Sequence, residues 1–135
     1  MIVNLSVEQF ARMWPTFEPL VKQVTDQSDG CFLPIDICLD VMAGRSAAWI
    51  GWDTEAQAVD VLIITTVRDF PRRRMLNLGV ISGRNVRRHQ AEALEVLTAY
   101  AHDLGCSAIT GSFRRGWTRI WPGVRENGVS LIKDI

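Results

Sequence analysis

The chain opens with apolar side chains at helical spacing. Val7, Phe10 and Trp14 are three and four residues apart, which would place them on one face of a helix. Ser6 and Gln9 form a Ser-x-x-Gln capping box directly before this run. The pattern therefore predicts that a helix begins after Ser6.

Prolines divide the region that follows. Pro15 and Pro19 lack the backbone N–H that a helix interior needs, so we expect them to break the first helix and leave a second short piece over residues 17–24. A third helix is predicted to begin at Pro34 and to end at Gly44. Its expected apolar face consists of Ile35, Cys38, Leu39 and Met42.

The middle of the chain alternates apolar runs with short polar links. Residues 47–52, 58–67 and 75–82 are rich in β-branched and aromatic side chains, which predicts three strands. The link over residues 53–56 is short enough for a hairpin, so we expect these strands to form an antiparallel meander. Asp60 is the one charged residue of the second strand.

A long amphipathic segment follows this meander. Residues 85–104 predict a helix that ends at Gly105, with its apolar face at Ala91, Leu94, Leu97, Ala101 and Leu104. A strand over 107–113, a short helix or turn over 114–121 and a last strand over 128–135 complete the pattern.

A strand–helix–strand unit of this kind requires a right-handed crossover between parallel strands. The predicted fold class is therefore α/β or α+β: a mixed sheet with N-terminal helices and one long crossover helix, forming a single domain over residues 1–135.

Composition excludes several classes of protein. The 135 residues are 47% hydrophobic, enough for a core, yet contain no apolar run long enough to span a membrane. The first ten residues do not resemble a secretory signal. Three cysteines without CxxC spacing indicate a reduced compartment and predict neither a metal site nor disulfides.

Charge is unevenly distributed although the net charge is zero. Residues 1–67 carry three basic and nine acidic side chains, whereas residues 68–135 carry twelve basic and six acidic ones. Thirteen of the basic residues are arginine, which matches phosphate and carboxylate oxygens. The second half could face an anionic partner. Alternatively, the two halves pair with each other or with a neighbouring subunit.

Tryptophan and arginine gather near the end of the chain. Trp117 and Trp121 are four residues apart and would share a helix face, flanked by Arg114, Arg115 and Arg119. This combination is typical of interaction hot spots, so these five residues are candidates for partner binding. The alternative is that both tryptophans belong to the core. Stacking on nucleic acid is a weaker hypothesis, because the net charge is zero.

The order of elements resembles the GNAT (GCN5-related N-acetyltransferase) family. The strand over 75–82 stands where such proteins have their central strand. The segment "EVLTAYAHDLGCSAITGSF" resembles the family's long helix, with Ala101 and Gly105 in the places of its Ala-x-x-x-Gly ending. The chain from residue 114 onward resembles the family's tail of short helix, turn and last strand. The resemblance implies a GNAT-like fold over residues 45–135.

A closer resemblance is to small GNAT-like proteins encoded by bacteriophages. It rests on Trp14 and on the segments "SDG", "AGRSAAWIGW" and "GCSAITGSFRRGWTRIW". It implies a non-catalytic component of the virion, with virion or host proteins as partners, a homo-oligomer as a further option, and the virion or host cytoplasm as its location. A host-factor inhibitor on the same scaffold is an alternative.

The family's cofactor loop has the pattern Arg/Gln-x-x-Gly-x-Gly/Ala, whose glycines let the backbone approach the pyrophosphate of coenzyme A. Counted back from Ala101 and Gly105, the two small positions hold Arg88 and Gln90, and the first position holds Asn85. A register shifted by three would read Arg88-x-x-Ala91-x-Ala93.

We favour the first register, in which the loop is degenerate and no cofactor is expected. The residues that could still contact acetyl-CoA, if the chain is an active N-acetyltransferase, are Ser82, Gly83, Arg84, Asn85, Arg87 and Arg88.

Catalytic side chains are sparse in this pattern, so no catalytic residue is assigned. Tyr100, the single tyrosine, lies inside the long helix, and the strand over 75–82 has no carboxylate. The acids nearest by strand order are Glu55, Asp60 and Asp69; in an active enzyme, water or Asp60 would be the base. His89 and His102 are predicted to be surface residues. Cys106 is predicted to be buried as a small apolar side chain.

Overall fold

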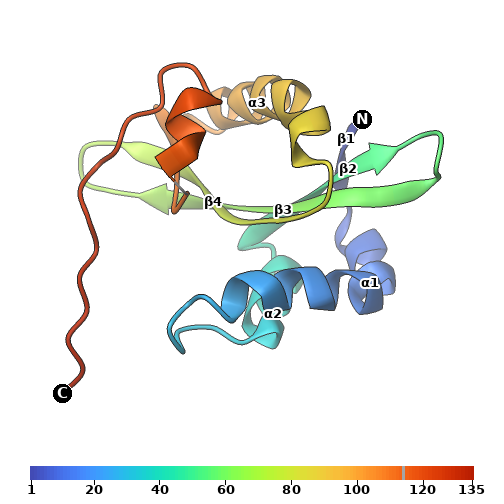
Figure 1. The fold of residues 1–135 in the computed structure, drawn as a ribbon, viewed down its shortest axis with the longest axis horizontal. Helices are drawn as coiled ribbons and strands as arrows, with labels where there is room; N and C mark the ends of the chain where they lie inside the picture. The colour runs from blue at the N-terminus through green and yellow to red at the C-terminus, as the bar shows by residue number, and fades with distance from the viewer. Residues whose placement is uncertain (114) are drawn as a thin grey trace.

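The computed structural model describes residues 1–113 and 115–135. A five-stranded sheet lies between two layers of helices (Figure 1). Its strands are β1 (Ile2–Leu5), β2 (Ser46–Asp53), β3 (Ala58–Asp69), β4 (Arg74–Gly83) and β5 (Ala108–Gly111). The helices are α1 (Val7–Thr25), α2 (Pro34–Met42), α3 (Val86–Asp103) and the 3-10 helix η1 (Arg115–Arg119).

The sheet follows the order β1-β2-β3-β4-β5. Strands β2, β3 and β4 form the predicted antiparallel meander, and β1 adds to β2 in antiparallel register. Strands β4 and β5 are parallel and are joined through α3, which confirms the predicted crossover unit. The predicted fold class, a mixed sheet with helices, is thereby confirmed.

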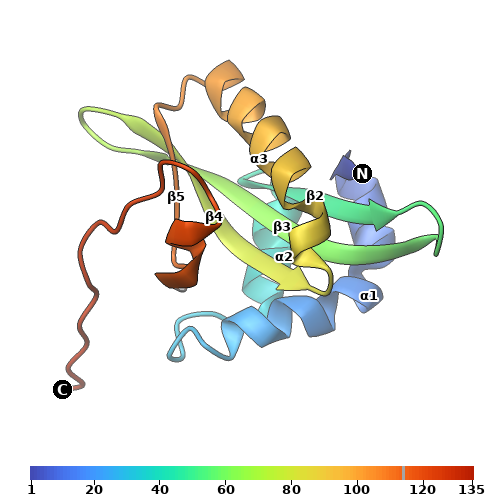
Figure 2. The ribbon, with the colours of Figure 1, turned by 45° about the horizontal axis from the view of Figure 1, so that its top comes forward.

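Each face of the sheet has its own apolar core. Helices α1 and α2 cover one face, where Phe10, Phe17 and Val21 of α1 are fully buried. Helix α3 crosses the other face, where Leu97 is fully buried (Figure 2). Trp49 packs on the α3 side, and Trp52 packs on the α1 side. Alternation along a strand therefore separates the two cores.

Helix α1 runs through both of its prolines, so the predicted break was wrong. The capping box at Ser6 and Gln9 is present as expected. Pro15 and Pro19 lie on the exposed face. The carbonyls that lose a helical N–H there can bind water instead, while the buried face keeps the helix together.

Two predictions at the ends of the chain were also wrong. Residues 2–5 were not expected to form a strand, but β1 pairs with residues 48–51 of β2. Residues 128–135 were expected to form a strand, but they are extended without one. A four-residue strand gives too weak a local pattern to be recognised, and an apolar run does not become a strand without a partner.

The sheet-facing stripe of α3 was predicted in part: Leu97 and Ala101 are buried as expected, and Leu94 and Leu104 pack partly buried against the same core. Its buried residues are His89, Ala93, Leu97 and Ala101, spaced by four, whereas Ala91 is exposed.

Among the residues that the structure describes, no helix has the length and apolarity to cross a bilayer.

Candidate functional site

The passage from β4 into α3 holds the six residues predicted to contact a cofactor. The strand ends at Gly83 and the helix begins at Val86, so two residues separate them. At Gly83 the backbone has a φ of +139°, and a Cβ there would come within 2.1 Å of the Asp60 carbonyl oxygen. The next N–H, that of Arg84, donates to the same oxygen at 2.7 Å. Glycine at position 83 therefore serves close contact with β3.

Two polar side chains of this passage also point into the protein. The Ser82 hydroxyl donates to Oε1 of Gln23 on α1, at 3.0 Å. Asn85 adopts the left-handed conformation and precedes α3, but its side chain does not cap the helix. Its amide instead donates to Oδ1 of Asp60, at 3.3 Å.

Arg88 is directed toward the hairpin that joins β2 and β3. Its guanidinium lies 2.8 Å from Asp53 Oδ2 and 3.6 Å from Asp60 Oδ2. The pKa of Asp53 is lowered, first by the backbone N–H of Ala56 and further by that of Glu55 and by Arg88. Arg88 therefore neutralises the hairpin carboxylates.

Asp60 and His89 form a buried pair. Nε2 of His89 lies 2.7 Å from Oδ2 of Asp60, and both side chains are about 95% buried. The prediction of a surface histidine was therefore wrong for His89. A hydrogen bond from His89 lowers the pKa of Asp60, against the opposing effect of burial, and Asn85 adds to the lowering.

The ring of His89 lies over Gly51, where an added Cβ would come within 2.8 Å of it. We call Asn85, Arg88, His89, Asp53 and Asp60 together the α3–hairpin cluster. A hollow of about 300 Å³ lies beside this cluster. It is lined by Met1, Trp52, Asp53, Thr54, Glu55, Arg88, His89 and Glu92.

The sequence contained a signal for this pair. Asp60 is the one charge in a strand that is otherwise apolar, and a buried carboxylate requires a partner. His89 lies on the same four-residue spacing as Ala93 and Leu97. The predicted stripe missed His89 because it was drawn through Ala91.

Strands β4 and β5 separate near the end of β5. Their pairing ends at Leu78 and Gly111, whereas β4 continues to Gly83. Neither β4 nor β5 carries an Asp, Glu, His, Tyr or Cys. On the α3 side of this point, Phe113, Trp117 and Trp121 form an aromatic cluster with ring centroids 5.3–5.8 Å apart.

Comparisons with protein-family models and with curated protein sequences found no match. Solved structures do match. The chain is similar over 100% of its length to 99% of a probable acetyltransferase, at 15% identity and a TM-score of 0.68. It is similar over 98% of its length to 99% of the ribosomal-protein-alanine N-acetyltransferase from Brucella melitensis biovar Abortus 2308, at 14% identity and a TM-score of 0.64. The fold is GNAT-like.

A third similar structure is glucosamine-6-phosphate N-acetyltransferase from Arabidopsis thaliana, at 12% identity and a TM-score of 0.64, covering 99% of this chain and 97% of that one. The TM-scores show that the fold is GNAT-like. Sequence identities this low leave the activity open.

The α3 entry of this GNAT-like chain does not fit the backbone cradle that acetyl-CoA requires. In the favoured register the two small positions hold Arg88, which binds the hairpin, and Gln90, whose amide donates to the Ile120 carbonyl oxygen at 3.1 Å. In the shifted register, Ala91 and Ala93 lie well inside α3, so they cannot form a loop. Arg84 and Arg87 are exposed and, among the described residues, make no ion pair.

The five residues predicted to bind a partner are in different environments. Trp121 is buried, with 4% of its surface exposed, as the core alternative proposed. Trp117 is half-buried and Arg119 is exposed. Arg114 lies outside the described residues, and of Arg115 only its place in η1 is described. Their role in partner binding stays a prediction.

The remaining chemical candidates do not lie together at the β4–β5 opening. Cys106 is buried as predicted, and Tyr100 lies on α3 with its ring 4.8 Å from that of Trp49. Burial raises the pKa of Tyr100. Asp69 pairs with Arg74 at the far end of the β3–β4 hairpin.

Proposed function

We propose that this chain is a GNAT-like protein that acts through protein contacts and not through acetyl transfer. The α3–hairpin cluster carries the proposal. Arg88 and Asn85, two of the side chains expected at a pyrophosphate, are bonded to Asp53 and Asp60. A phosphate that recruited Arg88 would leave these two carboxylates without their guanidinium.

The outer face of α2 supports a role in protein contacts. Together with the two residues before the helix, it exposes large apolar side chains, each between 43% and 66% accessible. These are Phe32, Leu33, Ile35, Leu39 and Met42. Apolar side chains that gather on one face of a soluble protein mark interaction surfaces, whereas scattered ones do not.

The resemblance of the sequence to small phage GNAT-like proteins is the ground on which we propose a place in a virus particle. In that setting the partners are other virion proteins. A host protein is the partner if the chain is an inhibitor. Intact particles separate the two settings, because a virion component is detected in them by mass spectrometry in fixed proportion to the capsid protein, whereas an inhibitor is absent.

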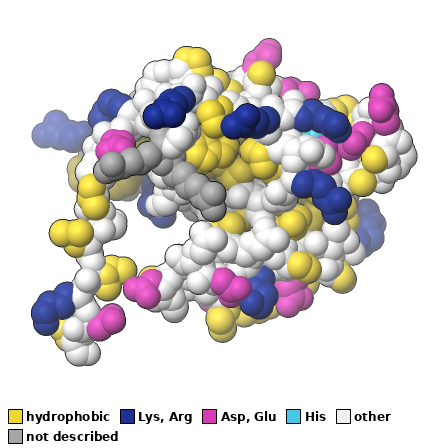
Figure 3. Space-filling model, viewed as in Figure 1, with side chains coloured by type: hydrophobic (Ala, Val, Ile, Leu, Met, Phe, Trp, Pro, Cys, Tyr) yellow, Lys and Arg dark blue, Asp and Glu magenta, His cyan; other side chains and the backbone are white. Residues whose placement is uncertain are grey.

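An acetyl-CoA-dependent N-acetyltransferase is the second candidate. Arg84 and Arg87 are exposed where α3 begins, and a helix N-terminus attracts anions. Figure 3 shows hydrophobic side chains between η1 and the start of α3, with Lys and Arg side chains beside them. These features suit a ligand with an apolar arm and phosphates.

A thermal melt with excess acetyl-CoA tests the proposal. Ligand at about 100 times its dissociation constant adds roughly 2.7 kcal/mol of stability, a shift of several degrees for a domain of this size. We expect no shift at millimolar acetyl-CoA. A shift that disappears in Arg84→Glu/Arg87→Glu but persists in the control Arg12→Glu/Lys22→Glu would favour the acetyltransferase.

A further inference from the structure

Helix α2 is apolar on two sides, and the described residues cover only one of them. Its inner side packs on α1 and β2, and the side chains covered there, fully or in part, are Ile37, Cys38 and Val41. Its outer side carries Ile35, Leu39 and Met42, spaced by four and three residues, and all three are exposed. A helix that is hydrophobic all round is normally buried. The outer side of α2 therefore has the composition of a covered surface.

The exposed apolar surface continues through the two residues before the helix. We call Phe32, Leu33, Ile35, Leu39 and Met42 together the α2 stripe. Five half-exposed large side chains present roughly 500 Å² of apolar surface, near the upper end of patches on monomeric proteins. Each partner in a standard stable interface buries about 800 Å², so the stripe is small for a dimer of two whole domains. It fits one helix laid along α2.

Carboxylates lie along both sides of the α2 stripe. At about 100° of rotation per residue, Asp36 projects on one side of the stripe and Cys38 on the other. Burial raises the pKa of the Cys38 thiol, and the nearby carboxylate of Glu18 raises it further. Glu18 of α1 therefore flanks the stripe on the Cys38 side. Both Glu18 and Asp36 are exposed.

The cations of this part of the chain do not neutralise these two carboxylates. Lys22 and Arg45 are the Lys and Arg residues between positions 13 and 67. Lys22 pairs with Asp26 at 2.6 Å, and Arg45 pairs with Asp40 at 2.9 Å. Among the described residues, Glu18 and Asp36 make no ion pair. The borders of the α2 stripe are therefore negatively charged.

This charge favours one class of occupant. A two-fold contact uses the same patch on both copies, so it would set the carboxylates of one stripe against those of the other. An anionic membrane surface is disfavoured for the same reason, because helices that lie on membranes carry Lys and Arg on their polar face. A basic partner gains from the charge that disfavours the other two.

We propose that the α2 stripe binds an amphipathic helix of another protein. The apolar side chains of that helix, spaced by three and four residues, cover Ile35, Leu39 and Met42, and its lysines or arginines lie beside Glu18 and Asp36. Apolar contact supplies the affinity, and the charges select the partner and its orientation. The inference rests on the proposed role in protein contacts and gives the chemistry of the partner.

Two designed helical peptides test this chemistry. Both carry leucine at heptad positions a and d, and positions e and g hold lysine in one peptide and glutamate in the other. The uniform charge of each peptide opposes its self-association. Fluorescence anisotropy with the full chain is expected to show saturable binding of the lysine peptide and at least fivefold weaker binding of the glutamate peptide. The difference is expected to shrink at about 1 M salt, where the Debye length is about 3 Å.

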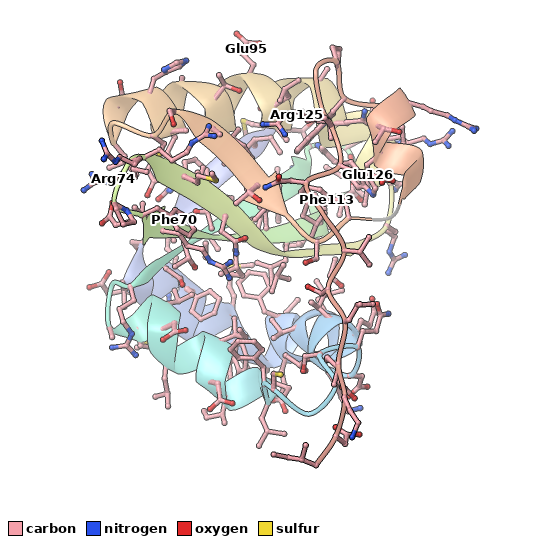
Figure 4. All side chains as sticks on the ribbon, turned by 90° about the vertical axis from the view of Figure 1, so that its left-hand side faces the viewer. Phe70, Arg74, Glu95, Phe113, Arg125 and Glu126 are labelled. Carbon is pink, nitrogen blue, oxygen red and sulfur yellow. The ribbon has the colours of Figure 1, made fainter. Side chains whose placement is uncertain are left out.

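An apolar substitution places the binding on the α2 stripe. Leu39→Asp is expected to weaken binding of the lysine peptide at least tenfold, because it puts a charge at the centre of the stripe. Phe70→Asp is the matched control, because Phe70 is an exposed apolar residue on the β3–β4 hairpin (Figure 4). This control is expected to bind the lysine peptide as the wild type does. Thermal melts check that both variants are folded.

A charge substitution tests the flanks. Glu18→Gln/Asp36→Asn keeps the shape of both side chains, and the new amide oxygen at position 36 can still accept from the Leu33 N–H. It is expected to reduce the preference for the lysine peptide by at least half. Glu95→Gln/Asp103→Asn is the matched control on α3, across the sheet from α2 (Figure 4), and is expected to leave the preference unchanged.

Three peptide results would overturn the inference: no saturable binding of the lysine peptide, a preference of less than fivefold over the glutamate peptide, or binding that Leu39→Asp does not weaken. Two further results would assign the stripe to another occupant. A full chain that is dimeric in light scattering, and monomeric as Leu39→Asp, would indicate a second copy. Binding to phosphatidylcholine vesicles that Leu39→Asp abolishes would indicate a membrane.

These measurements are independent of the test of the proposed function. None of them uses acetyl-CoA, so peptides that fail to bind leave the melting experiment unaffected. A melting shift with acetyl-CoA would count against the proposed function even if the lysine peptide binds to the α2 stripe.

Discussion

Gly83 shows how one residue can look like part of a ligand site and be required for another reason. Its position before a helix and its neighbouring arginines suggest a phosphate loop. The structure instead packs its α-carbon against the backbone of Asp60 on β3, at a φ of +139° that side chains disfavour. Close strand contact explains this glycine without any ligand.

Gly83→Ala is therefore expected to destabilise the protein by at least about 2 kcal/mol, because the new Cβ meets a backbone oxygen and the φ becomes strained. Chemical denaturation measures the loss. Gly116→Ala is the matched control, because among the described residues, its chain neighbours apart, no atom lies within 4 Å of the added Cβ. Equal stability of the two variants would contradict the tight contact with β3.

Asp60 and His89 predict how stability depends on pH. The pKa of folded Asp60 lies below its ordinary value, mainly because of the hydrogen bond from His89. The unfolded chain therefore binds the proton more tightly. The stabilising effect is complete above the unfolded pKa of about 3.9 and is lost as pH falls through the lower folded value.

Melting temperatures are thus expected to fall below about pH 4, and to fall less steeply in His89→Ala than in the wild type. Asp53 also has a lowered pKa, so part of the acid effect remains in this variant. His102→Ala, which changes an exposed histidine of the same helix, serves as the control. If the melting temperatures of His89→Ala and the wild type fell equally with decreasing pH, His89 would not be the cause of the acid dependence.

At the scale of elements, local sequence signals determine where helices begin. The Ser6 side chain accepts from the Gln9 N–H at 3.1 Å, and the Gln9 side chain accepts from the Ser6 N–H at 2.9 Å. Ser6→Ala is expected to cost about 1 kcal/mol, because one N–H at the start of α1 loses its acceptor. Urea denaturation measures this, with Ser112→Ala as a control outside any helix. An unchanged midpoint for Ser6→Ala would show that the cap contributes nothing.

Elements with strong periodicity could be predicted from the sequence. The β2–β3–β4 meander, α3 and its crossover to β5 follow from apolar spacing alone. Elements that depend on distant partners could not be predicted. Strand β1 exists because β2 offers it an edge, and α1 passes through Pro15 and Pro19 because three fully buried side chains hold its other face.

The site was predictable only in part, for a related reason. Asn85 and Arg88 at the α3 entry were recognised, but their binding partners Asp60 and Asp53 lie 25 and 35 positions earlier, on the β2–β3 hairpin. Spacing along a chain gives no measure of that proximity. The unpaired charge of Asp60 in an apolar strand indicated that a partner existed, and the structure identifies it as His89.

Across the whole molecule, the uneven charge of the sequence becomes a difference between layers. Lys and Arg side chains gather over α3 and η1 on the face shown in Figure 3, and Asp and Glu side chains gather over α1 and α2. Arg88 joins the two halves of the sequence, whereas Lys22–Asp26, Arg45–Asp40 and Arg74–Asp69 each pair within one half. Pairing between the halves therefore neutralises part of the asymmetry.

The protein is thus expected to bind a cation-exchange resin at pH 7 and low salt despite its zero net charge, because a local field acts within a Debye length. Arg84→Glu/Arg87→Glu is expected to abolish retention. Arg12→Glu/Lys22→Glu changes the net charge equally on the opposite layer and is expected to reduce retention much less. An equal loss of retention in both variants would show that retention depends on net charge and not on where the charges lie.

The α3–hairpin cluster also constrains how this chain could change over generations. Replacing Arg88 by the glycine of a phosphate loop would remove the cation beside Asp53 and Asp60 before any ligand compensated for it. The substitution is therefore harmful alone and useful only after a hairpin carboxylate has been lost. The effect of a mutation at Arg88 therefore depends on whether Asp53 or Asp60 has already been replaced, which is epistasis. This dependence fixes the order of mutations between a binding scaffold and a cofactor enzyme.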